Sequence, residues 1–202
     1  MARTRTIDVS ELPRDGFGVA SPAWWGTIGF MVIEGFSIAL CVFMYVYLSR
    51  RSPNWPPAGT PAPRFGVGTL VAVAFLLSLV PAAMLNRAAK SLDRGAVLLM
   101  LMIGAAVEAM IVGLRGYELH ALPMRWDGTS YGSVVWIAMG LHTTLLVADF
   151  GETLMFAALF LFAPLQKRHF ADVADSVLYW FFMVLIWMPV YFIIYVSPRF
   201  FR

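Results

Sequence analysis

The stretch SVVWIAMGLHTTLLVADFGETLMFAALFLFA, residues 133–163, decides the fold class, because it is long and apolar enough to cross a lipid bilayer. A spanning helix needs roughly 20 mostly apolar residues, since every backbone N–H and C=O must be paired within the helix where no water is present. Five segments meet this requirement: Ala23–Leu48, Phe65–Leu85, Gly95–Leu114, Ser133–Ala163 and Ser176–Val196. The sequence therefore predicts an all-α fold, a polytopic transmembrane bundle of five helices.

The composition of the chain agrees with this fold class. Apolar residues make up 60% and charged residues only 13% of the 202 residues, a balance that a soluble domain of this length could not solvate. Residues 1–22 form a polar N-terminal segment without the apolar core of a cleavable signal peptide, and residues 23–202 form one transmembrane domain. The net charge of +3 is spread over the loops, which argues against a nucleic-acid partner.

The distribution of basic residues predicts the orientation of the chain, because an odd number of spans places the two termini on opposite sides of the membrane. The side of the N-terminus carries eight basic residues: Arg3, Arg5, Arg14, Arg87, Lys90, Arg94, Lys167 and Arg168. The other side carries six: Arg50, Arg51, Arg64, Arg125, Arg199 and Arg202. Because cytoplasmic loops carry an excess of Lys and Arg, we expect a cytoplasmic N-terminus and a periplasmic C-terminus.

Ionisable residues within the predicted spans are the candidate functional residues, because a charge inside a bilayer is costly and needs a partner. Glu34 lies near the middle of the first span and must be neutral, paired or beside water. It is either a neutral group that is hydrogen-bonded between helices or part of a functional polar site. Glu108 lies two helical turns before Arg115, which we expect at a helix end, and this is too far for direct pairing along one helix. We therefore expect a neighbouring chain to supply the partner of Glu108.

The fourth predicted span carries three more candidates. His142 and Asp149 are two helical turns apart at ~3.6 residues per turn, so they share one face of the helix. Glu152 follows one turn later on an adjacent stripe. We expect either a short proton relay or an interhelical hydrogen-bond cluster without turnover.

A redox or metal centre within this chain is not expected from its ligands. Cys41 is the single cysteine, which excludes a multi-cysteine metal cluster. A haem held by His142 would need a second imidazole from a facing helix, and the other histidines, His120 and His169, fall in predicted loops. Nucleophile motifs and phosphate-binding loops are also missing from the sequence. We therefore expect no cofactor, no metal and no catalytic residue.

Several motifs, in order, resemble subunit III of the haem-copper respiratory oxidases in its five-helix form. GTIGFMVIE, residues 26–34, is similar to the family pattern in which Gly and Phe precede an intramembrane Glu. YELH, residues 117–120, is similar to the Tyr-Glu-Phe-His stretch of quinol-oxidase members, and DGTSYGS, residues 127–133, leads into the Gly-x-His signature at residues 140–142. The end of the chain, with His169-Phe170, Tyr179-Trp180 and Trp187 through Tyr191 to Tyr195, resembles the family's closing helix.

The chain also departs from the family pattern. Leu145 stands where the family has a second His, and Asp149 stands where a Gly is usual. In the last span, Phe181 and Val184 replace a His and an Asp. The branch of the family therefore stays open, including the subunit III-like proteins that associate with nitric oxide reductases.

The resemblance implies a non-catalytic subunit of a proton-pumping haem-copper terminal oxidase in the bacterial inner membrane. Such a subunit docks on oxidase subunit I, binds phospholipids, and supports proton uptake and stability in aerobic electron transport. Haem and copper are then expected in partner subunits, and the electron donor, cytochrome c or quinol, is set by other subunits. A small proton-coupled transporter is the remaining alternative, although no inverted repeat supports it.

The resemblance also implies where the site residues lie. Glu34 and His142 form the core of the expected proton or lipid site, with Asp149, Glu152 and Glu118 as secondary members. At the membrane surface, lipid headgroups are expected to meet Arg50, Arg51 or Arg64.

Overall fold

The computed structural model describes residues 16–200, which form a bundle of long helices. The elements are η1 (Gly18–Ala20), α1 (Pro22–Arg51), α2 (Phe65–Lys90), α3 (Arg94–His120), α4 (Ser130–Phe162), α5 (Lys167–Tyr191), η2 (Phe192–Val196) and α6 (Ser197–Phe200). A π-helical turn, η2, joins α5 to α6, so the last span is one continuous helical segment. Within residues 16–200, five segments are long and apolar enough to cross a membrane, which confirms the predicted all-α bundle.

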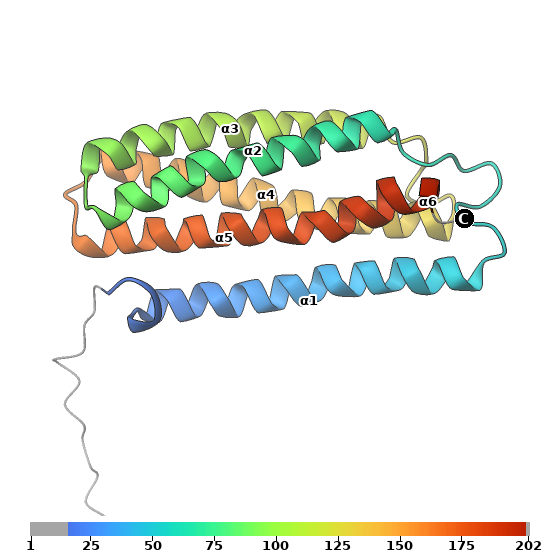
Figure 1. Cartoon of the computed structure of the whole chain (residues 1–202), viewed down its shortest axis with the longest axis horizontal. Coiled ribbons are helices and arrows are strands. Elements are labelled where there is room, and N and C mark those ends of the chain that lie inside the picture. Colours follow the sequence, from blue (N-terminus) through green and yellow to red (C-terminus); the bar gives the residue numbers. More distant parts are fainter. Residues whose placement is uncertain (1–15, 201–202) are drawn as a thin grey trace, which may run out of the picture.

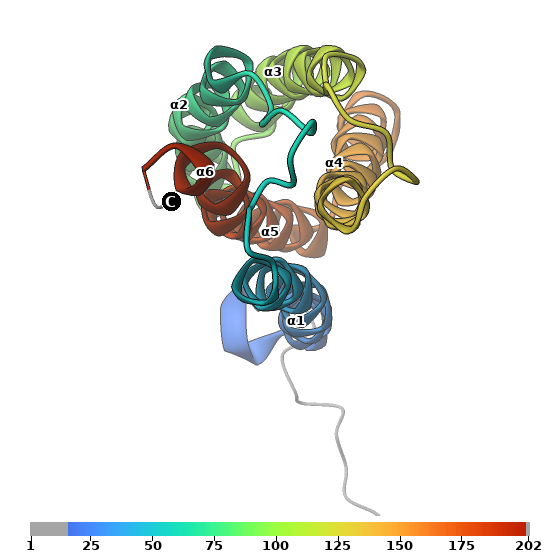
Figure 2. The ribbon, with the colours of Figure 1, turned by 90° about the vertical axis from the view of Figure 1, so that its right-hand side faces the viewer.

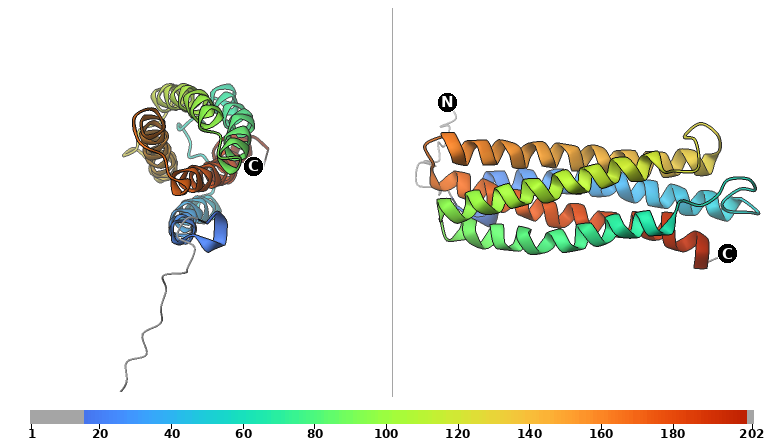
Figure 3. Two further views of the ribbon diagram at one scale, coloured as in Figure 1. Left: turned by 90° about the vertical axis from the view of Figure 1, so that its left-hand side faces the viewer. Right: turned by 90° about the horizontal axis from the view of Figure 1, so that it is seen from above.

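Four of the helices form a ring, and the fifth lies outside it. Figure 2 shows α2, α3, α4 and α5 around a common axis, with α1 beside α5 on the outer side of the ring. The contacts agree, because α2 packs on α3 and α5, α3 packs on α4, and α1 packs on α4 and α5. The helices run nearly parallel or antiparallel to one another along the whole bundle (Figures 1 and 3).

The helices extend beyond the predicted spans. The third helix ends at His120 rather than at Leu114, and the last one begins at Lys167 rather than at Ser176. Hydropathy detects only the apolar part of a helix, whereas the backbone hydrogen bonds continue until a capping residue ends them. One such cap is Thr129, whose hydroxyl accepts a hydrogen bond from the Gly132 N–H at 3.1 Å. Short loops therefore join α2 to α3 and α4 to α5, whereas residues 52–64 form a longer connection between α1 and α2.

The first 15 residues lie outside the described part of the chain. They include most of the predicted polar N-terminal segment, residues 1–22. Three of the basic residues counted for the N-terminal side, Arg3, Arg5 and Arg14, also lie there, as does Arg202 at the other end. The predicted orientation in the membrane stays a prediction.

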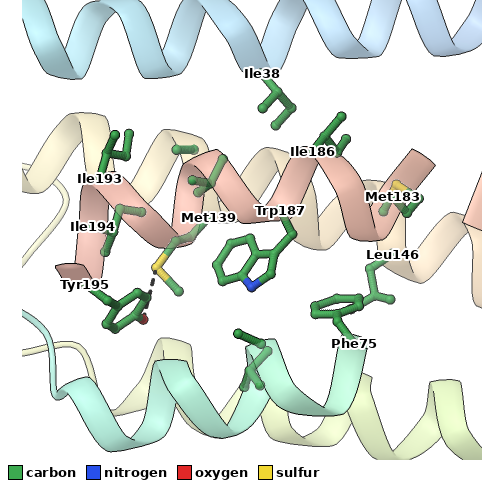
Figure 4. Close-up of a cluster of buried hydrophobic side chains, with 14 of the residues drawn as sticks. Ile38, Phe75, Met139, Leu146, Met183, Ile186, Trp187, Ile193, Ile194 and Tyr195 are labelled. Carbon is green, nitrogen blue, oxygen red and sulfur yellow. Dashed lines mark hydrogen bonds between the residues drawn. The ribbon is translucent and has the colours of Figure 1, made fainter. Parts of the chain in front are cut away.

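The hydrophobic core fills the ring around the fully buried Trp187 of α5. Figure 4 shows Phe75 of α2 and Met139 and Leu146 of α4 pointing toward the same interior as Trp187. Near the end of the last span, the Tyr195 ring packs against α2 so closely that a Cβ at Gly68 would lie 2.5 Å from the ring. Glycine at position 68 therefore allows α2 and the last span to meet.

The first helix is much less buried than the rest of the bundle. Only 11% of its most apolar 18-residue window is buried, against 50% for the last span. Its buried residues are Glu34, Ile38 and Tyr45, one side of the helix only. The outer side of α1 carries exposed large apolar residues such as Phe36, Leu40 and Phe43, which suit lipid tails or another membrane subunit.

Candidate functional site

Glu34 links the outlying helix α1 to the ring. Its side chain is buried, and the Tyr179 hydroxyl of α5 donates a hydrogen bond to Glu34 Oε2 at 2.6 Å. The adjacent Gly35 lies against the Phe182 ring, which would stand 3.3 Å from an added Cβ. The sequence identified Glu34 as a buried polar group, and the structure supplies a partner, Tyr179, that the sequence had not indicated.

His142 lies at the centre of the ring rather than beside Glu34. It is fully buried, and its Nε2 lies 3.1 Å from the Met183 carbonyl oxygen of α5. Because a carbonyl oxygen can only accept, the Nε2–H donates this bond. The imidazole packs between the rings of Phe75 and Trp187, with centroids 5.4 and 4.9 Å away. His142 therefore lies in an aromatic core, and its described hydrogen-bond partner is a backbone carbonyl group.

Two other carboxyl groups meet between α3 and α4. The Thr153 hydroxyl donates a hydrogen bond to Glu108 Oε1 at 3.0 Å. We had expected the partner of Glu108 to come from a neighbouring chain, but this partner lies within the chain itself. Asp149, one turn before Thr153, is 3% exposed. Glu108 and Asp149 both line a cavity of about 30 Å³ inside the ring. The structure therefore brings Asp149 together with Glu108 at this cavity.

A second hollow adjoins this cavity on the outside of the ring. It is a pocket of about 330 Å³ between α1, α4 and α5, and Asp149, Glu152 and Tyr179 are among the residues that line it. Through its hydrogen bond to Tyr179, Glu34 lies next to this pocket. Glu34, Asp149 and Glu152 thus gather in the half of the bundle where α1 begins.

Glu118 belongs to a separate cluster in the opposite half of the bundle. The Arg115 Nη1 donates to Glu118 Oε2 at 2.6 Å, and the Tyr195 hydroxyl donates to Glu118 Oε1 at 2.5 Å. The Arg115 guanidinium lies 3.7 Å from the centroid of the Trp187 ring, a cation–π contact. Glu118 therefore reaches the surroundings of His142 only through Arg115 and Trp187.

Arg115 corrects one expectation from the sequence. We expected it at a helix end, but it lies inside α3 and has no exposed surface. A buried guanidinium is tolerated here because a carboxylate one turn later and an aromatic face both compensate its charge. The signal in the sequence was the spacing of Arg115 and Glu118, three residues apart on one helix.

The three arginines expected at lipid headgroups are exposed at one end of the bundle. Arg50 and Arg51 end α1, and Arg64 precedes α2. The Arg51 guanidinium also lies over the Tyr47 ring, 5.3 Å from its centroid. This placement leaves the three charged groups accessible from outside the bundle.

The loop before α4 explains part of one family-like motif. The Arg125 guanidinium donates two hydrogen bonds to the Asp127 carboxylate, at 2.9 and 2.8 Å, and these bonds hold the pKa of Asp127 below its usual value. A Cβ at Gly132 would collide with the Arg125 carbonyl oxygen, so a residue with a side chain would push the loop away from α4. The motif therefore shapes this turn.

Removing the charge of Glu118 tests the buried cluster. We expect Glu118→Gln to lower the free energy of unfolding by about 3–5 kcal/mol, because it leaves the Arg115 charge buried without a counter-charge. The matched control is Asp127→Asn, which breaks an exposed pair with Arg125 and should leave unfolding unchanged within error. Denaturation of both purified variants in one detergent measures the difference. If the two substitutions change the free energy of unfolding equally, the buried pair contributes no more to stability than the exposed one.

Comparison with known proteins places the chain in a family. The family described as Cytochrome c oxidase subunit III matches residues 14–198. Cytochrome c oxidase subunit 3 of Rhizopus stolonifer is 23% identical over 96% of this chain and 74% of its own length. The corresponding protein of Allomyces macrogynus is 27% identical over 84% of this chain and 64% of its own length. Since the family match covers nearly all of the five-helix bundle, the chain belongs to the cytochrome c oxidase subunit III family.

Proposed function

We propose that the chain is a non-catalytic subunit of a proton-pumping haem-copper terminal oxidase in the bacterial inner membrane. The single observation that carries this proposal is the family match over residues 14–198. In this role the chain docks on oxidase subunit I, and haem and copper are bound by partner subunits. Two of its buried polar side chains bond within the chain, Glu34 to the Tyr179 hydroxyl and His142 to the Met183 carbonyl oxygen, which suits a subunit without a redox centre.

Lipid binding follows from the position of α1. Its outer side exposes a long apolar surface, and the exposed Arg50 and Arg51 lie at its end, at the same end of the bundle as Arg64. A phospholipid aligned with α1 would place its acyl chains on the apolar surface and its phosphate near these guanidinium groups. The proposal therefore assigns Arg50, Arg51 and Arg64 to headgroup phosphates.

Support of proton uptake follows from the carboxyl groups near the start of α1. Glu34, Asp149 and Glu152 lie in the half of the bundle that we predict to face the cytoplasm. Protons for an oxidase come from that side in the proposed role. Carboxyl groups at the mouth of a pocket can hold and release protons there.

Identification of the proteins that copurify with the chain tests this function directly. We expect the full-length chain, purified at native abundance in mild detergent, to bring with it a large subunit that contains haem and copper. A haem subunit without copper and with nitric oxide reductase activity would instead assign the chain to such a reductase. Purification without any haem-containing companion would contradict both assignments and favour a transporter.

Substitution of Glu34 tests its role within the complex. Glu34→Ala removes the acceptor for the buried Tyr179 hydroxyl, which costs about 1–3 kcal/mol, and should loosen α1 without changing the haem spectra. We expect faster inactivation during turnover or partial loss of the subunit. Glu34→Gln should be milder, because an amide oxygen still accepts the bond.

The matched control for Glu34 is Ser37→Ala, since Ser37 is only half-buried on α1 and its hydroxyl donates to the Ile33 carbonyl oxygen of its own helix. Turnover number, inactivation rate and subunit stoichiometry of the purified complex are the three measurements. If Glu34→Ala matches the wild type in all three, Glu34 is a tolerated buried group without a functional role.

A further inference from the structure

Two neighbouring hollows share the same side chains. The cavity inside the ring, about 30 Å³, is lined by residues of α2, α3, α4 and α5, and Asp149 and Ser176 belong to its wall. The same two residues also line the pocket of about 330 Å³ between α1, α4 and α5. Asp149 therefore stands between an enclosed cavity and a pocket at the outside of the ring.

Two carboxyl oxygens at the inner cavity have no partner. Asp149 Oδ1 and Glu108 Oε2 are buried without a hydrogen bond to any described residue, and their side chains are only 3% and 7% exposed. Leaving such groups unsatisfied is destabilising, because they have lost their hydrogen bonds to water. A water molecule needs only about 10–15 Å³ and two to four polar partners, so this cavity is large and polar enough for one or two.

The charges around Asp149 require a proton as well as water. The titratable groups that face it are Glu108 from α3, Glu152 from its own helix, Glu34 from α1 and Tyr179 from α5, and α2 adds the neutral Ser78 to the cavity. None of these described groups is a cation. Two ionised carboxylates at one small, buried cavity would repel each other, so at least one proton must stay between them.

The geometry points to a binding site for one or two water molecules and one exchangeable proton, shared by Glu108 and Asp149 inside the ring. Asp149 connects this site to the outer pocket and to Glu152, which gives the proton a way in and out. The inference does not rest on the proposed oxidase function.

Infrared spectroscopy of the full chain in lipid nanodiscs tests the site. The spectrum of the wild type minus that of a Glu108→Gln, Asp149→Asn double variant should contain the C=O stretching band of a protonated carboxyl group. Transfer to D2O should shift this band, because water in the cavity exchanges the proton. The single variants Glu108→Gln and Asp149→Asn should each shift the band rather than abolish it. Asp127→Asn, in the exposed loop, should leave it unchanged.

Three results would overturn the inference. Absence of a protonated carboxyl band from the difference spectrum would mean that no proton is shared. A band whose frequency does not change in D2O would mean that no water reaches the cavity. A band that disappears on addition of sodium ions at constant pH would mean that the carboxyl groups hold a cation instead. If the double variant does not fold, D2O exchange of the wild type and the shift in each single variant decide the same question.

Discussion

The structure depends on one constraint, which is that polar groups within the bilayer core have no water to bond to. The helices satisfy their own backbone, and the loops lie at the two ends of the bundle. Buried polar side chains must then find partners on other helices. Four pairs do so and join the helices: Tyr179 with Glu34, Thr153 with Glu108, Trp180 with Ser78 and Tyr195 with Glu118. Asp149 Oδ1 and Glu108 Oε2 are exceptions, because neither has a hydrogen-bond partner among the described residues.

These pairs separate the bundle into two halves with different character. The half that contains the start of α1 holds the carboxyl groups Glu34, Glu108, Asp149 and Glu152, with two hollows between them. The other half holds the charge-compensated pair of Arg115 and Glu118, closed by the aromatic core around Trp187. The first half suits proton and water traffic, whereas the second suits rigid packing. This division is consistent with a subunit that supports a proton-pumping complex rather than one that carries its chemistry.

The sequence predicted the fold well because the bilayer imposes a simple pattern of length and apolarity. It identified the five spans and the shared burial of His142 and Asp149, since both follow from periodicity along one helix. It did not identify the partners Tyr179 and Met183, because those contacts depend on the rotation and register of helices that are distant in sequence. The spacing of Arg115 and Glu118 could have predicted their ion pair, but we expected Arg115 at a helix end.

We propose that the polar interior of this chain joins its helices and holds water and protons, and that the redox centres of the complex lie in partner subunits. His142, the one histidine in the centre of the ring, uses its Nε2–H on a backbone carbonyl and faces aromatic rings. The absorption spectrum of the chain after complete removal of other subunits tests this claim most directly. The account predicts no Soret band, while a band that persists at near one haem per chain would contradict it.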